Sequence, residues 1–312
     1  MKKLFIFLYF FTTFLLEAQP LPHLILHFDI NKTLIASDKT ENKSMEDVIN
    51  ELLSKKYVAY WEENLPEPLT FEAYVRTILL PGDEHDIKLK EARLVYLIHF
   101  IDYLSQHQHP LYQTVLEELT EVVETLKRME GKVFSSFYRL LEELNQKKIS
   151  YTLFLRSFGE EIFEVKNEIN AVFKDLVKAE GRFRRGILYF HHQHLREPQA
   201  IYDFFCSQEH AAIHDDWHYW VEGKMEAKYG KPLYIDRKNR DILVLFFDDN
   251  IKTSSFEKNI ISPMDCQTGQ EISIPLLLQS KQLIAVNTLE AILNELYYIE
   301  CVQEALRIHQ MQ

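Results

Sequence analysis

Glycine is scarce in this sequence, with 8 residues in a chain of 312. Loops that wrap phosphate groups in P-loop and dinucleotide-binding enzymes need glycines at fixed spacing, because only glycine lets the backbone approach the phosphate closely. Neither the G-x-x-x-x-G-K-[ST] pattern nor the G-x-G-x-x-G pattern occurs in the chain. The sequence therefore argues against both of these enzyme classes.

Cysteine is also scarce. Cys206, Cys266 and Cys301 are far apart along the chain and form no C-x-x-C pair. Small disulfide-stabilised domains use larger, even sets of cysteines, because several bridges must replace a missing hydrophobic core. The chain is therefore no disulfide scaffold, and its three cysteines allow one bridge at most.

Positive charge is in deficit, with 35 Lys and Arg against 47 Asp and Glu and a net charge of −12. Nucleic-acid backbones and anionic membrane surfaces repel such a protein unless it carries a local basic patch. The best local cluster, Arg182-Phe183-Arg184-Arg185, is short and is typical of a solvated turn before a strand. We therefore expect no nucleic-acid partner.

The first apolar run, from Leu4 to Leu16, is shorter than the ~20 residues that a membrane-spanning helix needs. Two lysines precede the run and Ala18 follows it, a pattern that resembles a secretory signal peptide. We predict a signal peptide over residues 1–19 and, after its cleavage, an exported protein without stable membrane insertion. An uncleaved membrane anchor and a buried first strand of a cytoplasmic protein remain the alternatives.

Short apolar runs alternate with helical patterns along the rest of the chain. The candidate strands are residues 24–28, 149–155, 186–190, 242–247 and 283–286. Strands that are apolar throughout are typical of parallel sheets with both faces covered, and helices between such strands favour the same architecture. We predict an α/β fold with a doubly wound parallel sheet.

Residues 40–145 contain no convincing strand. Within this stretch, the apolar residues of 111–129 follow one face of a helix, and Ser44 with Asp47 resembles a capping box before another helix. We predict a helical insertion over 40–145 that follows the first strand. The α/β core would then consist of residues 20–39 and 146–312.

Polar residues of a particular kind follow three of the predicted strands. Asp29-x-Asn31 follows the first strand, Ser157 the second, and Asp248-Asp249 the strand over 242–247. Because ligands of open α/β sheets bind beyond the carboxyl ends of the strands, we expect these residues to lie close together. Carboxylate and carbonyl oxygens are the ligands that Mg²⁺ prefers, so the cluster predicts a magnesium site.

The same residue types suit phosphoryl transfer. A carboxylate such as Asp29 can accept a phosphoryl group, which divides one difficult displacement into two easier steps. The negative charge on the transferring group needs a cation and fixed hydrogen-bond donors. Ser157 is the candidate donor and Lys231 the candidate cation, with Lys224 and Lys228 as nearby alternatives for the lysine.

In this order along the chain, Asp29-x-Asn31-x-Thr33, Ser157, Lys231 and Asp248-Asp249 resemble the four motifs of the haloacid dehalogenase superfamily. The resemblance implies a doubly wound, Rossmann-like sheet with a mainly helical cap, here residues 40–145. It implies a magnesium-dependent phosphatase or phosphotransferase that acts on a small phosphorylated substrate, with Asp29 as nucleophile. The implied metal ligands are the side chains of Asp29, Asp248 and Asp249 and the carbonyl of Asn31.

Asn31 departs from the motif, because phosphatases of this superfamily usually carry a second aspartate there as general acid and base. A carboxamide cannot exchange a proton in this way at neutral pH, whereas a backbone carbonyl ligand is unaffected. Two hypotheses therefore stay open. The chain is either a phosphoryl-transfer enzyme with another proton donor or slow turnover, or a catalytically weakened protein that binds a metal and a phosphate ligand.

Histidines support a different hypothesis. His210, His214 and His218 recur at a spacing that would align them on one face of a helix. Two such histidines bind zinc when a third ligand joins them. The candidates for that ligand are Asp215, Asp216, His191, His192 and His194. The alternative is a packed helix with the histidines at its rim.

Overall fold

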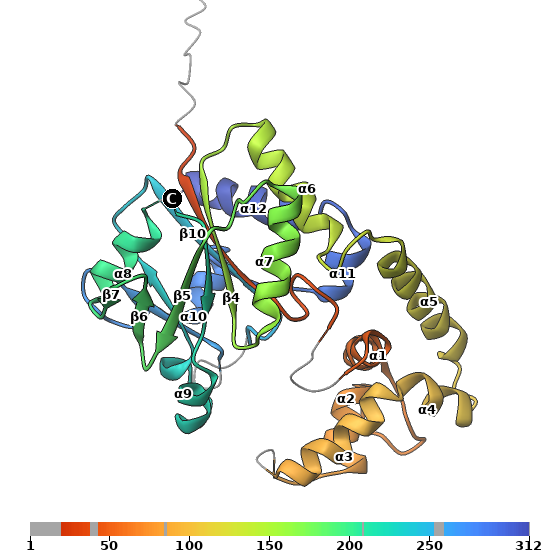
Figure 1. Cartoon of the computed structure of the whole chain (residues 1–312). Helices are drawn as coiled ribbons and strands as arrows, with labels where there is room; N and C mark the ends of the chain where they lie inside the picture. The colour runs from red at the N-terminus through yellow and green to blue at the C-terminus, as the bar shows by residue number, and fades with distance from the viewer. Residues whose placement is uncertain (1–19, 38–42, 84–85, 208, 253–258, 312) are drawn as a thin grey trace, which may run out of the picture.

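The computed structural model describes residues 20–37, 43–83, 86–207, 209–252 and 259–311. The predicted signal peptide, residues 1–19, lies outside the described residues. The described chain has an α/β fold built on a mostly parallel, eight-stranded sheet (Figure 1). The α/β class and the mostly parallel sheet predicted from the sequence are therefore confirmed. No described helix combines the length and the apolar character that crossing a membrane requires.

The strands of the central sheet lie in the order β12-β10-β1-β4-β8-β5-β6-β7. Neighbouring strands from β12 to β5 are parallel, whereas β6 and β7 extend one edge in antiparallel fashion. The strand bounds are β1 His23–Asp29, β4 Tyr151–Ser157, β5 Ala179–Arg184, β6 Ile187–Phe190, β7 Gln193–Leu195, β8 Ala211–His214, β10 Ile242–Asp248 and β12 Leu283–Ala285.

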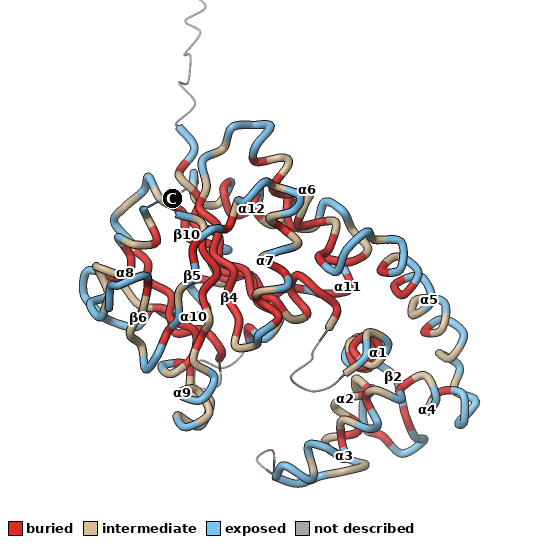
Figure 2. Tube along the Cα trace, in the orientation of Figure 1, coloured by how far each residue is buried: buried red, intermediate tan, exposed pale blue. Residues whose placement is uncertain are grey.

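The central strands are apolar throughout because both faces of the sheet are buried. In β1, Leu24, Leu26 and Phe28 belong to one hydrophobic core, whereas Ile25 belongs to the core on the opposite face. Figure 2 shows the buried trace that runs through the centre of the sheet. Helices on both faces therefore explain why these strands lack the alternation of polar and apolar residues seen in half-exposed strands.

Each face has its own set of covering elements. The first core includes residues from α6 (Ser135–Gln146), α7 (Glu161–Val172), α11 (Thr288–Leu293) and α12 (Tyr297–Met311). The second core includes residues from α8 (Pro198–Phe205), α10 (Ile274–Gln279) and the small parallel sheet of β9 (Lys231–Ile235) and β11 (Ile261–Asp265). The short helix α9 (Trp217–Glu222) and the 3-10 turn Ala227–Tyr229 lie between β8 and β9.

Between β1 and α6 the chain leaves the sheet and forms a mainly helical part beside it (Figure 1). We call its described residues between 43 and 128 the insertion. Its elements are α1 (Met45–Lys56), β2 (Val58–Ala59), β3 (Leu69–Thr70), α2 (Phe71–Tyr74), a π-helix (Val75–Leu79), α3 (Ile87–Ile98), α4 (Phe100–Gln106) and α5 (Tyr112–Arg128). The next helix, α6, packs against α12, and its apolar residues belong to the core of the sheet.

The start of α1 follows the predicted pattern. The Ser44 side chain accepts a hydrogen bond from the Asp47 N–H, and the Asp47 carboxylate accepts one from the Ser44 N–H, which confirms the capping box.

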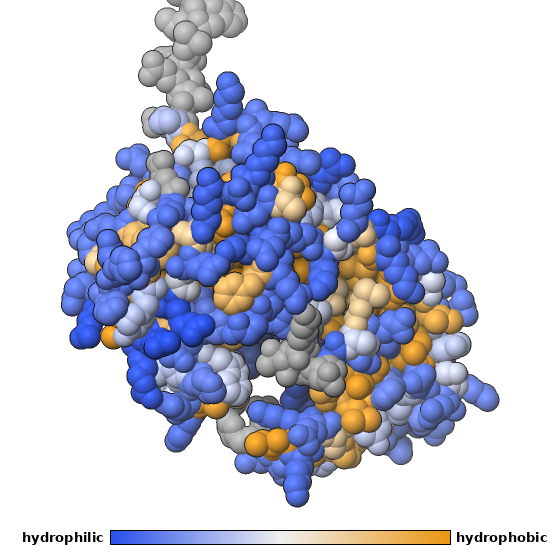
Figure 3. Space-filling model, viewed as in Figure 1, coloured by the Kyte–Doolittle hydropathy of each residue, from blue (hydrophilic) through white to orange (hydrophobic). Residues whose placement is uncertain are grey.

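The surface of the insertion differs from that of the sheet-bearing part. In Figure 3 apolar residues gather over the insertion at the lower right, whereas the rest of this view is mostly hydrophilic.

Candidate active site

The candidate site lies where the strand order of the sheet reverses. From β1 the chain continues to β4 on one side, and it returns later to β10 on the other side of β1. Such a reversal opens a crevice at the carboxyl ends of the central strands, where open α/β sheets bind ligands. Asp29 ends β1 and Asp248 ends β10, so the fold places both carboxylates at that edge.

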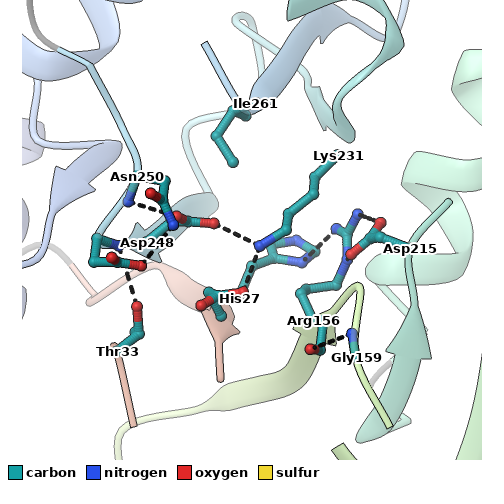
Figure 4. A network of polar contacts seen from close by, with 12 residues as sticks. His27, Thr33, Arg156, Gly159, Asp215, Lys231, Asp248, Asn250 and Ile261 are labelled. Carbon is teal, nitrogen blue, oxygen red and sulfur yellow. Dashed lines mark hydrogen bonds and ion pairs between the residues drawn. The ribbon is translucent and has the colours of Figure 1, made fainter. Parts of the chain in front are cut away.

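Three carboxylates and one ammonium group meet at this edge. Asp29, Asp248 and Asp249 each offer an oxygen, and these oxygens lie within 4.8 Å of one another. Lys231 Nζ donates to Asp29 Oδ1 at 2.5 Å and to Asp248 Oδ2 at 2.6 Å (Figure 4). The Lys231 side chain is 1% exposed. The structure therefore brings together four of the predicted site residues, three carboxylates and the buried Lys231.

Electrostatics explain why this cluster suits a cation. Only one ammonium group, Lys231, bonds directly to these carboxylates, so the cluster has an excess of negative charge when all three are ionised, and burial makes that excess costly. Burial and the Asp248 carboxylate raise the pKa of Asp29 to about 7, although Lys231 acts in the opposite direction. Burial, Asp248 and Asp29 likewise raise the pKa of Asp249 well above its ordinary range. A divalent cation would neutralise the excess, and an all-oxygen donor set fits a hard cation such as Mg²⁺.

The neighbouring carboxylates stabilise the charged form of Lys231. Burial alone lowers the pKa of Lys231, but the attraction of Asp248 and Asp29 outweighs burial and raises the pKa. The ammonium group therefore stays charged throughout the physiological range. The two sequence alternatives lie elsewhere: Lys228 is exposed and pairs with Glu226 at 2.9 Å, and Lys224 is exposed after α9. Only Lys231, among these three, reaches the carboxylates.

The loop after β1 is fixed by contacts from distant parts of the chain. Thr33 Oγ1 accepts a hydrogen bond from the Asp249 N–H at 3.1 Å, and the Thr33 carbonyl accepts one from the Tyr298 hydroxyl. The Lys32 carbonyl accepts a hydrogen bond from Thr288 Oγ1 at 2.5 Å. These bonds connect the loop to the end of β10 and to the C-terminal helices. The loop is therefore held rigidly against the carboxylate cluster.

Asn31 lies in this loop, two residues after Asp29. Its Oδ1 is buried and accepts no hydrogen bond from any described residue. Buried acceptors without a donor are uncommon in folded proteins, because each one loses its hydrogen bond to water. A ligand that donates a hydrogen bond to Asn31 would remove this cost.

Ser157 lies at the same edge of the sheet, on the neighbouring strand. Arg156 pairs with Asp29 in the register of β4 and β1, so Ser157 is one residue beyond the level of Asp29. Ser157 is buried, and its Oγ accepts a hydrogen bond from the Gly159 N–H at 3.0 Å. The hydroxyl hydrogen can still be donated to a ligand. Ser157 forms no described hydrogen bond to the carboxylates themselves.

A buried ion pair beside the site has no counterpart in the sequence prediction. Arg156 donates to both carboxylate oxygens of Asp215, at 2.6 and 3.0 Å, and both side chains are 0% exposed. The same guanidinium donates to the Pro232 carbonyl at 3.2 Å, next to Lys231 in β9. His27 Nδ1 lies 3.3 Å from it. Figure 4 shows the pair beside the lysine. A charged residue inside an apolar strand was the available signal for Arg156.

The helix predicted over the histidines is wrong. Residues Ala211–His214 form strand β8, and α9 begins only at Trp217. His210 Nδ1 accepts a hydrogen bond from the Leu153 N–H at 2.9 Å, and His214 Nε2 lies 3.5 Å from the Glu160 carboxylate. In a strand, alternate residues point to opposite faces, so a spacing of four residues no longer aligns the three histidines on one face of a helix. Within the described chain, Asp29, Asp248 and Asp249 are the one group of three acidic, His or Cys residues whose ligand atoms lie close enough together to share a metal ion.

Comparisons with known proteins identified no relative of this chain. The chain matches no family model, no curated protein and no solved structure.

Proposed function

We propose that this chain is a magnesium-dependent phosphoryl-transfer enzyme that forms an aspartyl-phosphate on Asp29. The observation that carries the proposal is the meeting of Asp29, Asp248 and Asp249 with Lys231 at the carboxyl ends of β1 and β10. The excess negative charge of the ionised carboxylates favours a bound cation, and a buried lysine beside a carboxylate favours an anionic substrate. A small phosphorylated molecule satisfies both requirements.

Each residue then has a definite task. When bound, Mg²⁺ supplies positive charge against the phosphate oxygens, and Asp29, Asp248, Asp249 and the Asn31 carbonyl would hold it. An Asp29 oxygen bonds to phosphorus, the bond to the leaving oxygen breaks, and that oxygen takes a proton from water. Lys231 neutralises charge on the transferring group, and Ser157 donates a hydrogen bond to one of its oxygens. Water then cleaves the aspartyl-phosphate and releases phosphate.

The proposal includes a family and an architecture. We assign the chain to the haloacid dehalogenase-like enzymes, with a doubly wound, Rossmann-like core and the insertion as a mainly helical cap. This cap is shorter than the predicted 40–145, because α6 packs into the core of the sheet. The support comes from the strand order around β1, from helices on both faces of the sheet and from the position of the insertion directly after the Asp29 loop. Export after cleavage of residues 1–19 stays a prediction from the N-terminal sequence.

The test is Asp29→Asn, which keeps the shape of the side chain and removes its ability to accept a phosphoryl group. Hydrolysis of p-nitrophenyl phosphate with Mg²⁺ should fall to background, while the circular dichroism spectrum stays unchanged. Asp102→Asn is the matched control, because Asp102 lies exposed on α4 and should retain full activity. Equal turnover by the Asp29 variant and the parent protein would refute the nucleophile.

The second candidate function is binding of a metal and a phosphate ligand without efficient turnover. The observation that favours it is Asn31, whose buried Oδ1 lacks a described donor and whose amide cannot relay protons. Asn31→Asp separates the two functions. If only the acid and base group is missing, hydrolysis should rise by about 100-fold or more. No gain would favour the binding protein or an enzyme with a different proton donor.

A further inference from the structure

A large cavity adjoins the proposed site on the side of β4, β8 and β5. Its volume is about 720 Å³, within the range of pockets that bind small ligands. His214 ends β8 and pairs with Ser157 of β4 on one side and with Arg182 of β5 on the other. The cavity therefore opens at the same edge of the sheet as Asp29, and His214 lies two strands away from β1.

Two side chains connect the cavity to the proposed site. Phe158 lines the cavity, and Lys231 Nζ lies 5.1 Å from the centre of its ring. Asp215 also lines the cavity, and it belongs to the buried pair with Arg156 beside Lys231. Phe158 therefore lies between Lys231 and the cavity, whose lining includes neither Asp29 nor Lys231.

The three arginines of the cavity wall differ in their ion pairing. Arg185 is paired with Glu222 at 2.5 Å and lies over the Tyr219 ring. Arg182 and Arg184 are exposed, and neither forms an ion pair with a described carboxylate. Arg184 lies 5.8 Å from the centre of the Tyr189 ring. Two guanidinium groups of the cavity wall are therefore available to an anion.

Most acidic residues of the cavity wall already have partners within the chain. Asp215 receives both of its bonds from Arg156. Asp216 accepts hydrogen bonds from the backbone N–H groups of Arg185 and Tyr219. Glu160 lies 3.5 Å from His214. Because Arg182 and Arg184 form no ion pair with a described carboxylate, their end of the cavity favours a negatively charged group.

The cavity also offers flat apolar surface. Trp217 lines it and is 43% exposed, and Phe158 is backed by the Trp220 ring at 5.6 Å. An exposed tryptophan on a cavity wall suits stacking against a planar ring, and such stacking binds nucleobases in many proteins. Arginine and aromatic side chains together therefore favour a ligand that has both a planar ring and a second phosphate.

The geometry points to a phosphomonoester substrate of the nucleoside bisphosphate class, which rests on the proposed function. One phosphate is transferred at Asp29, the base lies against Trp217, and the second phosphate binds Arg182 and Arg184. The leaving group of the substrate thus occupies the cavity between α9 and the β5–β6 edge.

The test compares three ligands in the full chain with Mg²⁺. Adenosine 3′,5′-bisphosphate has a base and two phosphates, adenosine 5′-monophosphate lacks the second phosphate, and fructose bisphosphate lacks the base. The bisphosphate nucleotide should bind at least about tenfold more tightly than either of the others, since each lost charge-assisted bond or stacked ring costs about one order of magnitude. Calorimetry on Asp29→Asn gives these affinities without turnover.

The double variant Arg182→Ala, Arg184→Ala identifies the second phosphate site. It should remove the preference for the second phosphate, so that the affinity ratio of bisphosphate to monophosphate falls from about tenfold or more to about one. Arg128→Ala, on the exposed face of α5, removes one comparable charge outside the cavity and should keep the ratio. A double variant that keeps the ratio, or fructose bisphosphate binding as tightly as the nucleotide, overturns the inference.

The two proposals fail in different ways. If Asp29→Asn retains p-nitrophenyl phosphate turnover while the nucleotide affinities follow the expected order, the function is refuted and the cavity assignment stands. If Asp29 is required for turnover but the three ligands bind equally, the function stands and the assignment of the cavity is refuted.

Discussion

The sheet edge and the insertion both bury charged groups, but with opposite balance. At the sheet edge, three carboxylates surround one lysine, and the pKa of Asp29 rises to about 7. In the insertion, Glu51 of α1 lies within 4 Å of Lys32, Lys43 and Lys55. Burial alone raises the pKa of Glu51, but the three lysines outweigh burial and lower it to about 2.

The difference teaches how to distinguish a binding site from a structural ion pair. Glu51 has more positive than negative neighbours, so its charge is compensated within the chain and contributes to stability. The carboxylates at the sheet edge are under-compensated by the described residues, so their ionised forms favour an additional cation. A buried acidic cluster with raised pKa values is therefore the stronger candidate for function.

Loss of the lysine should give the largest effect. Lys231→Met leaves Asp29 and Asp248 without their buried partner and should lower the free energy of unfolding by about 5 kcal/mol, measured by urea titration with EDTA present. Adding Mg²⁺ should restore part of the loss, because the cation replaces positive charge. Lys228→Met, at an exposed site, is the control. A loss below about 1 kcal/mol would mean that the cluster is not charged when folded.

The next largest effect should come from the pair beside the site. Arg156→Met leaves the Asp215 carboxylate buried without its bidentate partner and should destabilise the protein by about 3 to 4 kcal/mol. Adding Asp215→Leu to this variant should recover much of the stability, since no charge is then buried alone. Equal stability of the single and double variants in thermal unfolding would contradict an ion pair of this strength.

The insertion should show a smaller, pH-dependent effect. The pKa of Glu51 is about 2 in the folded chain and 4.5 ordinarily, so its contribution is complete above about pH 4.5 and disappears as the pH falls toward 2. Glu51→Gln should therefore cost at most about 3 kcal/mol at neutral pH, and the variant and parent should converge in acid. A difference that stays constant between pH 6 and pH 3 would contradict this charge balance.

An exposed ion pair sets the lower limit of the series. Arg128 Nη2 lies 3.3 Å from the Glu124 carboxylate on α5, and both side chains are more than half exposed. Glu124→Gln should change the free energy of unfolding by less than about 0.5 kcal/mol, because water and salt screen such pairs. Chemical unfolding at low and high salt checks this value. A larger change would mean that burial does not determine how much a charged pair contributes to stability.

Part of the fold was predictable because local patterns specified it. Apolar runs at 24–28, 149–155 and 242–247 correspond to β1, β4 and β10, and Ser44 with Asp47 correctly marked the start of α1. The sequence patterns do not predict β5, β7 and β8 of the central sheet, nor the short strands β2, β3, β9 and β11. β5 alternates exposed charged residues with buried ones at the margin of the sheet, and β8 has four residues, too few for a periodicity.

The histidine spacing shows how a local pattern misleads. The i, i+4, i+8 positions of His210, His214 and His218 fit a helix, yet pairing of Ala211–His214 with both β4 and β5 makes this segment a strand. Hydrogen bonds to two neighbouring strands outweigh the weak preference of four residues for a helix. No neighbouring strand can be seen from the segment itself.

The sequence by itself determined which residue types end the buried strands, because continuous apolar runs and the acids after them are local features. Only the tertiary structure decided that Asp29 meets Lys231, which lies 202 positions away, and that Arg156 pairs with Asp215. The physical reason is that strand order and register, set by packing of the whole sheet, determine which strand ends become neighbours. Local propensity contains no information about such contacts.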